Sequence, residues 1–95
     1  MPYIHITHSP GIGLREYRAV QEAMGPEPIA GNLLSLVGER DGALHVVDVW
    51  ESATAADRFA AERLFPAFER TGITPGPHDT VTAFEAQLVV DQLPR

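Results

Sequence analysis

The sequence predicts one α+β domain in which two strand-helix-strand halves are joined by a hairpin. Two segments carry apolar residues at helical spacing, and four segments have the composition or the alternation of strands. An Asp-Gly pair at positions 41 and 42 separates the second strand from the third. The order is therefore βαββαβ, and right-handed crossovers place both helices on one face of a four-stranded antiparallel sheet.

The first half of the chain is predicted to contain a strand, a helix and a second strand. Residues 3–8 alternate β-branched or aromatic residues with polar ones, and the Ser-Pro-Gly run at 9–11 ends this strand. Apolar residues then recur every three or four positions over 14–24, which predicts an amphipathic helix that ends at Gly25. The apolar run over 29–39 predicts the second strand.

The link between the second and third strands is the clearest local signal in the chain. Asp41-Gly42 lies between two apolar runs, the second of which covers residues 44–50. A type I′ turn needs positive φ at both of its central residues, and Asp-Gly is a favoured pair there. The two strands are therefore predicted to be antiparallel neighbours.

A second helix is predicted over residues 54–70, followed by a fourth strand over 80–90. Thr54 resembles the start of a capping box, although Ser52 is an alternative N-cap. Pro66 lies inside the helical pattern and cannot continue its hydrogen bonding, so a kink or a new short turn is expected there.

The third strand is apolar on both sides, which is unusual for a sheet with one solvated face. Val47 and Val49 lie opposite the face that carries Leu44, Val46 and Trp50. Two helices cover only one face, and burial of a Val or Leu side chain is worth roughly 1.5–3 kcal/mol. We therefore expect a homodimer in which the uncovered sheet face packs against that of a second copy.

Composition restricts the class of protein. Residues 1–95 suffice for one small domain, and no apolar run approaches the roughly 18 residues that a membrane span needs. The N-terminus lacks the features of a signal peptide, so a cytoplasmic protein is expected. A net charge of -6 without a basic cluster argues against a nucleic-acid partner.

Two short motifs add a family resemblance that extends over nearly the whole chain. Val-Trp-Glu-Ser ends the third predicted strand at 49–52, and Leu-Phe-Pro-Ala-Phe lies in the following helix at 64–68. With this length and element order, the chain resembles the dimeric α+β barrel superfamily, whose monomers have a ferredoxin-like fold. Within it, the chain looks most like the antibiotic-biosynthesis-monooxygenase (ABM) group of small actinobacterial proteins.

The resemblance implies a pocket between sheet and helices but leaves several activities open. Members of the superfamily include cofactor-free monooxygenases, haem-degrading enzymes, polyketide cyclases and isomerase-like enzymes. By position, the pocket lining would include Val46, Asp48 and Trp50. The haem-degrading branch also expects an Asn on the first strand and a His in the helix after the third strand. Both are missing here, which disfavours haem degradation.

Asp48 and Trp50 are the leading catalytic candidates. A carboxylate among valines that faces a pocket would have a raised pKa and could act as a general base. Alternatively, Asp48 is hydrogen-bonded or paired with an Arg across the sheet. Trp50 offers a flat surface for a polycyclic substrate, or it is a core residue.

The four histidines are the groups that exchange protons near neutral pH. His5 and His8 point to opposite faces of the first strand, and His45 lies on the face opposite Trp50. His5 and His78 are therefore the preferred catalytic candidates. The sequence contains no HxH or HxxxH pair, the spacings typical of metal ligands, so no metal is expected.

The substrate-binding candidates are mostly aromatic. The Tyr17 hydroxyl and the Asn32 amide could orient a quinol or keto oxygen, although Tyr17 could equally pack in the core and Asn32 could mark a bulge. Phenylalanines contribute to the core or to the pocket, and one of them lies beside Pro66, where it could shape the pocket mouth. These residues are Phe59, Phe65 and Phe68.

The resulting hypothesis is a cofactor-independent monooxygenase acting on an aromatic polyketide or a quinol-type substrate. No nucleotide-binding or nucleophile motif is present, and Gly11-Ile12-Gly13 is too short a match to indicate nucleotide binding, so no cofactor is expected. One alternative is a non-oxidative cyclase or isomerase that uses the same pocket. The other is a non-catalytic, ligand-binding dimer.

Overall fold

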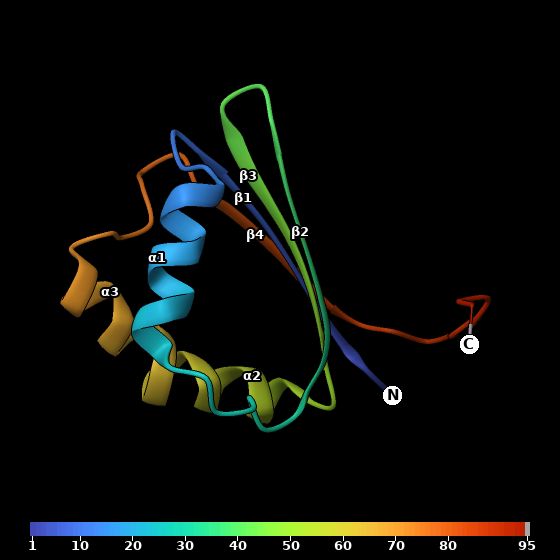
Figure 1. Ribbon diagram of the computed structural model, residues 1–95. Coiled ribbons are helices and arrows are strands. Elements are labelled where there is room, and N and C mark those ends of the chain that lie inside the picture. Colours follow the sequence, from blue (N-terminus) through green and yellow to red (C-terminus); the bar gives the residue numbers. More distant parts are fainter. Residues whose placement is uncertain (95) are drawn as a thin grey trace.

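A computed structural model describes residues 1–94 and shows a four-stranded antiparallel sheet with all of its helices on one face (Figure 1). The sheet order is β2-β3-β1-β4. This arrangement confirms the predicted ferredoxin-like α+β fold. The elements are β1 (Tyr3–Pro10), α1 (Leu14–Met24), β2 (Asn32–Arg40), β3 (Ala43–Trp50), α2 (Ala53–Phe59), the π-helical segment η1 (Ala60–Leu64), α3 (Phe65–Thr71) and β4 (Thr80–Glu85).

The β2-β3 hairpin confirms the turn prediction. Asp41 and Gly42 both have positive φ, at 53° and 74°. This is the conformation that a type I′ turn requires, and aspartate and glycine tolerate it better than most residues. Arg40 pairs with Ala43, so the turn sets the register of the hairpin from there to Leu34, beyond which a bulge shifts it.

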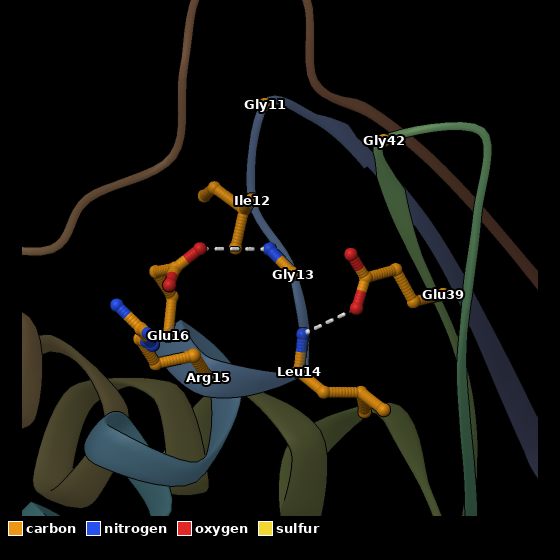
Figure 2. A pocket seen from close by; sticks show the side chains of 8 residues that line it. All are labelled: Gly11, Ile12, Gly13, Leu14, Arg15, Glu16, Glu39 and Gly42. Atoms are coloured by element: carbon orange, nitrogen blue, oxygen red, sulfur yellow. Dashed lines mark hydrogen bonds between the residues drawn. The ribbon is translucent and has the colours of Figure 1, made fainter.

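The start of α1 is capped by two carboxylates of the protein itself (Figure 2). The Gly13 N–H donates to Glu16 Oε1 at 2.9 Å, and the Leu14 N–H donates to Glu39 Oε2, from β2, at 3.2 Å. A Cβ at position 13 would lie 2.7 Å from Glu39 Oε1, so glycine permits this approach. These N–H groups therefore bind carboxylates rather than presenting a phosphate site, although an open hollow of about 350 Å³ lies beside them.

The second helical region has three parts, and the last of them begins at Phe65, which agrees with the expected new turn at Pro66 rather than with a kink in one helix. Ser52, and not Thr54, is the N-cap, because its hydroxyl accepts from the Ala55 N–H at 3.1 Å. The irregularity begins before Pro66, as a π-helical turn in which the Phe65 N–H donates to Ala60 O. Pro66 has no N–H, and it lies in the first turn of α3, where a helix tolerates this loss.

Two arginines tie this region to the end of α1. The Arg63 guanidinium donates to four backbone carbonyls, two of which are Met24 O at 2.9 Å and Glu27 O at 2.9 Å. Arg70 Nη1 donates to Ala23 O at 2.7 Å. Cations at a helix C-terminus satisfy its last carbonyls and complement its dipole. The side chains that make these bonds come from η1 and α3.

β2 and β4 are shorter than predicted. β2 begins at Asn32 rather than residue 29, because the preceding residues form a turn in which the Asn32 N–H donates to Ile29 O. The predicted fourth strand over 80–90 is wrong beyond Glu85, which pairs with Tyr3. The last backbone bond of this edge joins the Ala86 N–H to Pro2 O, and Pro2 has no N–H to continue the ladder.

The two faces of the sheet differ sharply (Figure 1). The helices lie over one face. Within residues 1–94, no helix or strand covers the other face, on which the strand registers place Ile6, Leu34, Leu36 and Phe84. These four side chains are between 38% and 56% exposed. The buried apolar residues are few, namely Val20, Ala43, Leu44, Val46, Trp50 and Ala67.

Candidate functional site

The space between the sheet and the helices is a cavity of about 490 Å³. It lies within the range of roughly 300–1,000 Å³ that is usual for small-molecule sites. Phe65 on α3 and Val81 on β4 both line it while remaining 55% and 56% exposed. The cavity therefore opens to solvent where these two residues lie.

A polar row crosses the cavity floor on three neighbouring strands. Asp48 on β3 is paired in register with Ser35 on β2 and with His5 on β1. All three side chains line the cavity, and Ser35 Oγ donates to Asp48 Oδ1 at 2.6 Å. Asp48 is thus hydrogen-bonded across the sheet, as one of the alternative expectations had it, but its partner is a serine and not an arginine.

The cavity raises the pKa of Asp48. Burial is the main cause, and it outweighs the hydrogen bond from Ser35 and the nearby His5, both of which favour the ionised carboxylate. The pKa of Tyr17 is raised as well, by burial and by the charge of Asp48. A carboxylate and a protonated phenol therefore act on the same space, one as an acceptor of protons and the other as a donor of hydrogen bonds.

Aromatic side chains line the rest of the cavity. Trp50 is 2% exposed and packs against Phe59, with ring centroids 5.1 Å apart. Trp50 is therefore both a core residue and a part of the cavity wall. Phe65 and Phe68 lie nearer the opening, with ring centroids 6.2 Å apart. Such surfaces suit a flat, apolar ligand.

The cavity collects nearly all the residues that the sequence suggested. Its lining includes Asp48, Trp50, His5, Tyr17, Asn32, Val46, Phe59, Phe65 and Phe68. His78 belongs to the loop before β4 and is not part of this lining. Asn32 Nδ2 donates to Val49 O at 3.4 Å, next to a register shift in β2, so this amide also supports the expected bulge. His8 and His45 face each other in the β1-β3 register, with ring centroids 4.8 Å apart.

Sequence reasoning missed several polar residues of the cavity, among them Ser35, Ser9 and Asp79. Ser35 lies in an apolar strand, and the bulge of this strand changes which of its residues face the cavity, so alternation alone did not identify it. Ser9 and Asp79 lie in segments that read as turn and loop, yet both line the cavity, and Ser9 Oγ donates to Asp79 Oδ2 at 2.9 Å. The antiparallel pairing of β1 with β4, in which His8 lies opposite Thr80, brings these two residues together.

The charged groups that line the cavity are carboxylates. Glu16, Asp48, Asp57 and Asp79 contribute to the lining, whereas no arginine within residues 1–94 does. In the same part of the chain, no cluster of three His, Cys, Asp or Glu side chains could hold a metal ion. Nor does this part contain a helix long and apolar enough to cross a membrane.

No protein-family model matches the sequence, and neither does any curated protein. Solved structures are similar in fold. A mutant form of SnoaB, a cofactor-independent oxygenase from Streptomyces nogalater, has a TM-score of 0.66 at 15% identity over 96% of this chain and 98% of its own. A putative antibiotic biosynthesis monooxygenase from Deinococcus radiodurans has a TM-score of 0.58 at 19% identity over 99% and 100%.

A third structure comes from the haem-degrading protein Rv3592 of Mycobacterium tuberculosis. Its TM-score is 0.57 at 21% identity, over 96% of this chain and 100% of its own. These likenesses confirm that the chain has the fold of the ABM-like proteins. Because one fold supports different activities, the function has to be argued from the cavity.

Proposed function

We propose that this protein is a cofactor-independent monooxygenase that oxidises an aromatic polyketide or a quinol-type substrate. The observation that carries the proposal is Asp48, a carboxylate with a raised pKa on the floor of a cavity with aromatic walls. A base of this kind deprotonates a phenol, or a C–H group activated by a neighbouring carbonyl. The resulting anion is electron-rich enough to react with dioxygen directly.

For an anthrone, the proposed chemistry needs only substrate and dioxygen. Asp48 removes one proton from the ring CH₂ group, and the carbanion transfers an electron to dioxygen. The two radicals combine to form a C–O bond, and protonated Asp48 returns its proton to the peroxide. Loss of the second C–H proton then breaks the O–O bond and releases water, leaving a carbonyl. One CH₂ group and one O₂ thus give one C=O group and one H₂O.

Tyr17 and the aromatic wall are assigned to binding. The raised pKa of Tyr17 keeps its hydroxyl protonated, so it donates a hydrogen bond to a substrate oxygen. Trp50 and Phe68 provide flat surfaces for the fused rings. Haem is a poorer match, because its propionates need cationic partners and the described lining offers no arginine.

We also propose that the protein functions as a homodimer. Ile6, Leu34, Leu36 and Phe84 are exposed apolar residues that the strand registers place on the bare side of the sheet. Association of two such surfaces would remove them from water, at roughly 25 cal/mol for each Å² buried. This contact leaves the cavity free, since the cavity lies on the opposite side of the sheet.

Oxygen uptake by the purified protein tests the proposed activity. The assay uses a panel of anthrones and hydroquinones, with chelator and without added cofactor. We expect uptake that depends on the protein and falls about 100-fold or more in Asp48→Asn. Substrate turnover without oxygen uptake would instead support a cyclase or isomerase, and ligand binding without turnover would support a binding protein.

A further inference from the structure

A second polar pair lies in the cavity, away from Asp48. Ser9 is only 5% exposed and donates its hydroxyl hydrogen to Asp79 Oδ2. The other carboxylate oxygen, Asp79 Oδ1, is buried and has no hydrogen-bond partner among residues 1–94. Both side chains line the cavity. A buried acceptor without a partner is unfavourable, and it therefore marks a place where a ligand would gain affinity.

We infer that Ser9 and Asp79 form a second anchoring point, which binds a hydrogen-bond donor on the end of the ligand remote from Asp48. The inference deepens the proposed function and rests on its premise that a small molecule occupies the cavity. Asp79 Oδ1 accepts the bond, while Ser9 holds the other oxygen and fixes the carboxylate orientation.

The sheet register gives the distance between the two anchoring points. Asp48 pairs with His5, and Ser9 lies four residues further along β1, opposite Leu44. At about 3.3 Å per residue, the two rows are about 13 Å apart. Between them the floor carries Val46, which is buried and apolar, and its register partner Thr7. The ligand is therefore elongated, with a polar group at each end.

The charges of the lining determine the kind of polar group. The ionisable side chains at the cavity are carboxylates, Tyr17 and His5, and no arginine within residues 1–94 joins them. A ligand carboxylate or phosphate would meet like charges there, whereas a hydroxyl or an amine N–H donates to Asp79 directly. The substrate class that fits is a fused aromatic with a hydroxyl at each end and no acidic group.

Three anthraquinones test this inference by binding alone. The first carries one hydroxyl on each terminal ring. The second carries a hydroxyl on one terminal ring only, and the third carries a carboxylate at the position of the hydroxyl of the second. Quenching of Trp50 fluorescence reports occupancy, because this residue is the only tryptophan and lines the cavity. We expect the dihydroxy compound to bind about tenfold more tightly than the monohydroxy compound, and the carboxylate to bind most weakly.

Substitution assigns the preference to a residue. In Asp79→Ala the tenfold preference for the second hydroxyl should disappear, whereas Asp57→Asn, which changes an exposed carboxylate of the same lining, should retain it. Circular dichroism confirms that each variant is folded. If Asp79→Ala does not fold, the order of affinities of the three compounds for the unaltered protein still tests the inference.

Equal affinity for the mono- and dihydroxy compounds would overturn the inference, as would binding of none of the three, or a preference that survives in Asp79→Ala. The outcome is separable from the proposed activity because the measurement involves no turnover. If the protein prefers the dihydroxy compound but takes up no oxygen with any substrate, the anchoring point is retained and the oxygenase proposal is rejected. Uptake without the preference would reject the anchoring point alone.

Discussion

Two effects shift the pKa of Asp48 in opposite directions. Burial in the cavity disfavours its ionised form, and the hydrogen bond from Ser35 recovers only part of that loss, since the pKa remains raised. A carboxylate that is hard to ionise binds a proton more strongly once ionised, which is the property of a general base. Activity and stability should therefore respond in opposite directions when this side chain becomes an amide.

The first prediction concerns the pH dependence of activity. Only the ionised carboxylate accepts a proton, so the rate should rise with pH through the pKa of Asp48, at a pH above the usual range of an aspartate. A pH profile of oxygen uptake at low substrate concentration measures this pKa. Asp48→Asn should lower the rate about 100-fold or more and remove the acidic limb from the residual activity. An unchanged rate in this variant would refute the assignment of the base.

The second prediction concerns stability. Because the pKa of Asp48 is raised by folding, its contribution to stability is fully present below the ordinary pKa of aspartate. That contribution is lost as the pH rises through the folded-state value. Asp48→Asn, which stays uncharged, should therefore have a higher urea midpoint than the unaltered protein at pH 7, and the difference should shrink in acid. A lower midpoint at neutral pH would mean that the ionised carboxylate stabilises the fold.

At the scale of elements, the helical layer is held together by side chains that act over long sequence separations. Arg63 projects from the π-helical segment η1 and donates to carbonyls on both sides of the end of α1. The widened turn also brings Ala60 and Leu64 to the cavity. The segment η1 thus holds the end of α1 and lines the ligand site, which is consistent with the frequent location of π-helical turns at functional sites.

The third prediction tests this tie. Arg63→Met keeps much of the apolar stem but removes donors to Met24 O, Gly25 O, Glu27 O and Pro28 O. We expect a loss of about 1–3 kcal/mol in the free energy of unfolding, the usual cost when donors to partly buried groups are removed. Arg58→Met on the exposed side of α2 is the matched control and should change stability by less than about 0.5 kcal/mol. Urea denaturation of both variants makes the comparison, and equal losses would contradict the assigned role.

What the sequence predicts correctly is what local signals determine. Helical spacing marks α1, and Asp41-Gly42 marks the hairpin, because both depend on residues close together in the chain. The end of β4 depends instead on Pro2, more than eighty positions away, so alternation alone extends that strand too far. The Ser9-Asp79 pair was missed for the same reason, since these residues are seventy positions apart in the chain.

On the scale of the whole molecule, the fold buries little apolar surface. The core side chains are few, and the cavity occupies space that a packed core would otherwise fill. A chain of 95 residues has few means of compensating for this, and it contains no cysteine for disulfides. Association through the bare face of the sheet would supply the missing burial. On this view, the cavity and the dimer are linked, because the second copy provides stability that the hollow interior does not.

The fourth prediction follows from that link. Val47 lies on the bare face of β3 and pairs with Leu36 on one side and Ile6 on the other, so Val47→Lys places a charge in the middle of the apolar surface. Light scattering should give twice 10.3 kDa for the unaltered protein and for Asp48→Asn, which changes the opposite face, but a smaller mass for Val47→Lys. The dissociated variant should also unfold at a lower urea concentration, because the surface that each copy shields from water becomes exposed. A monomeric mass for the unaltered, folded protein would show that this face is tolerated in water, and the stability of the hollow domain would then have to come from the helical layer alone.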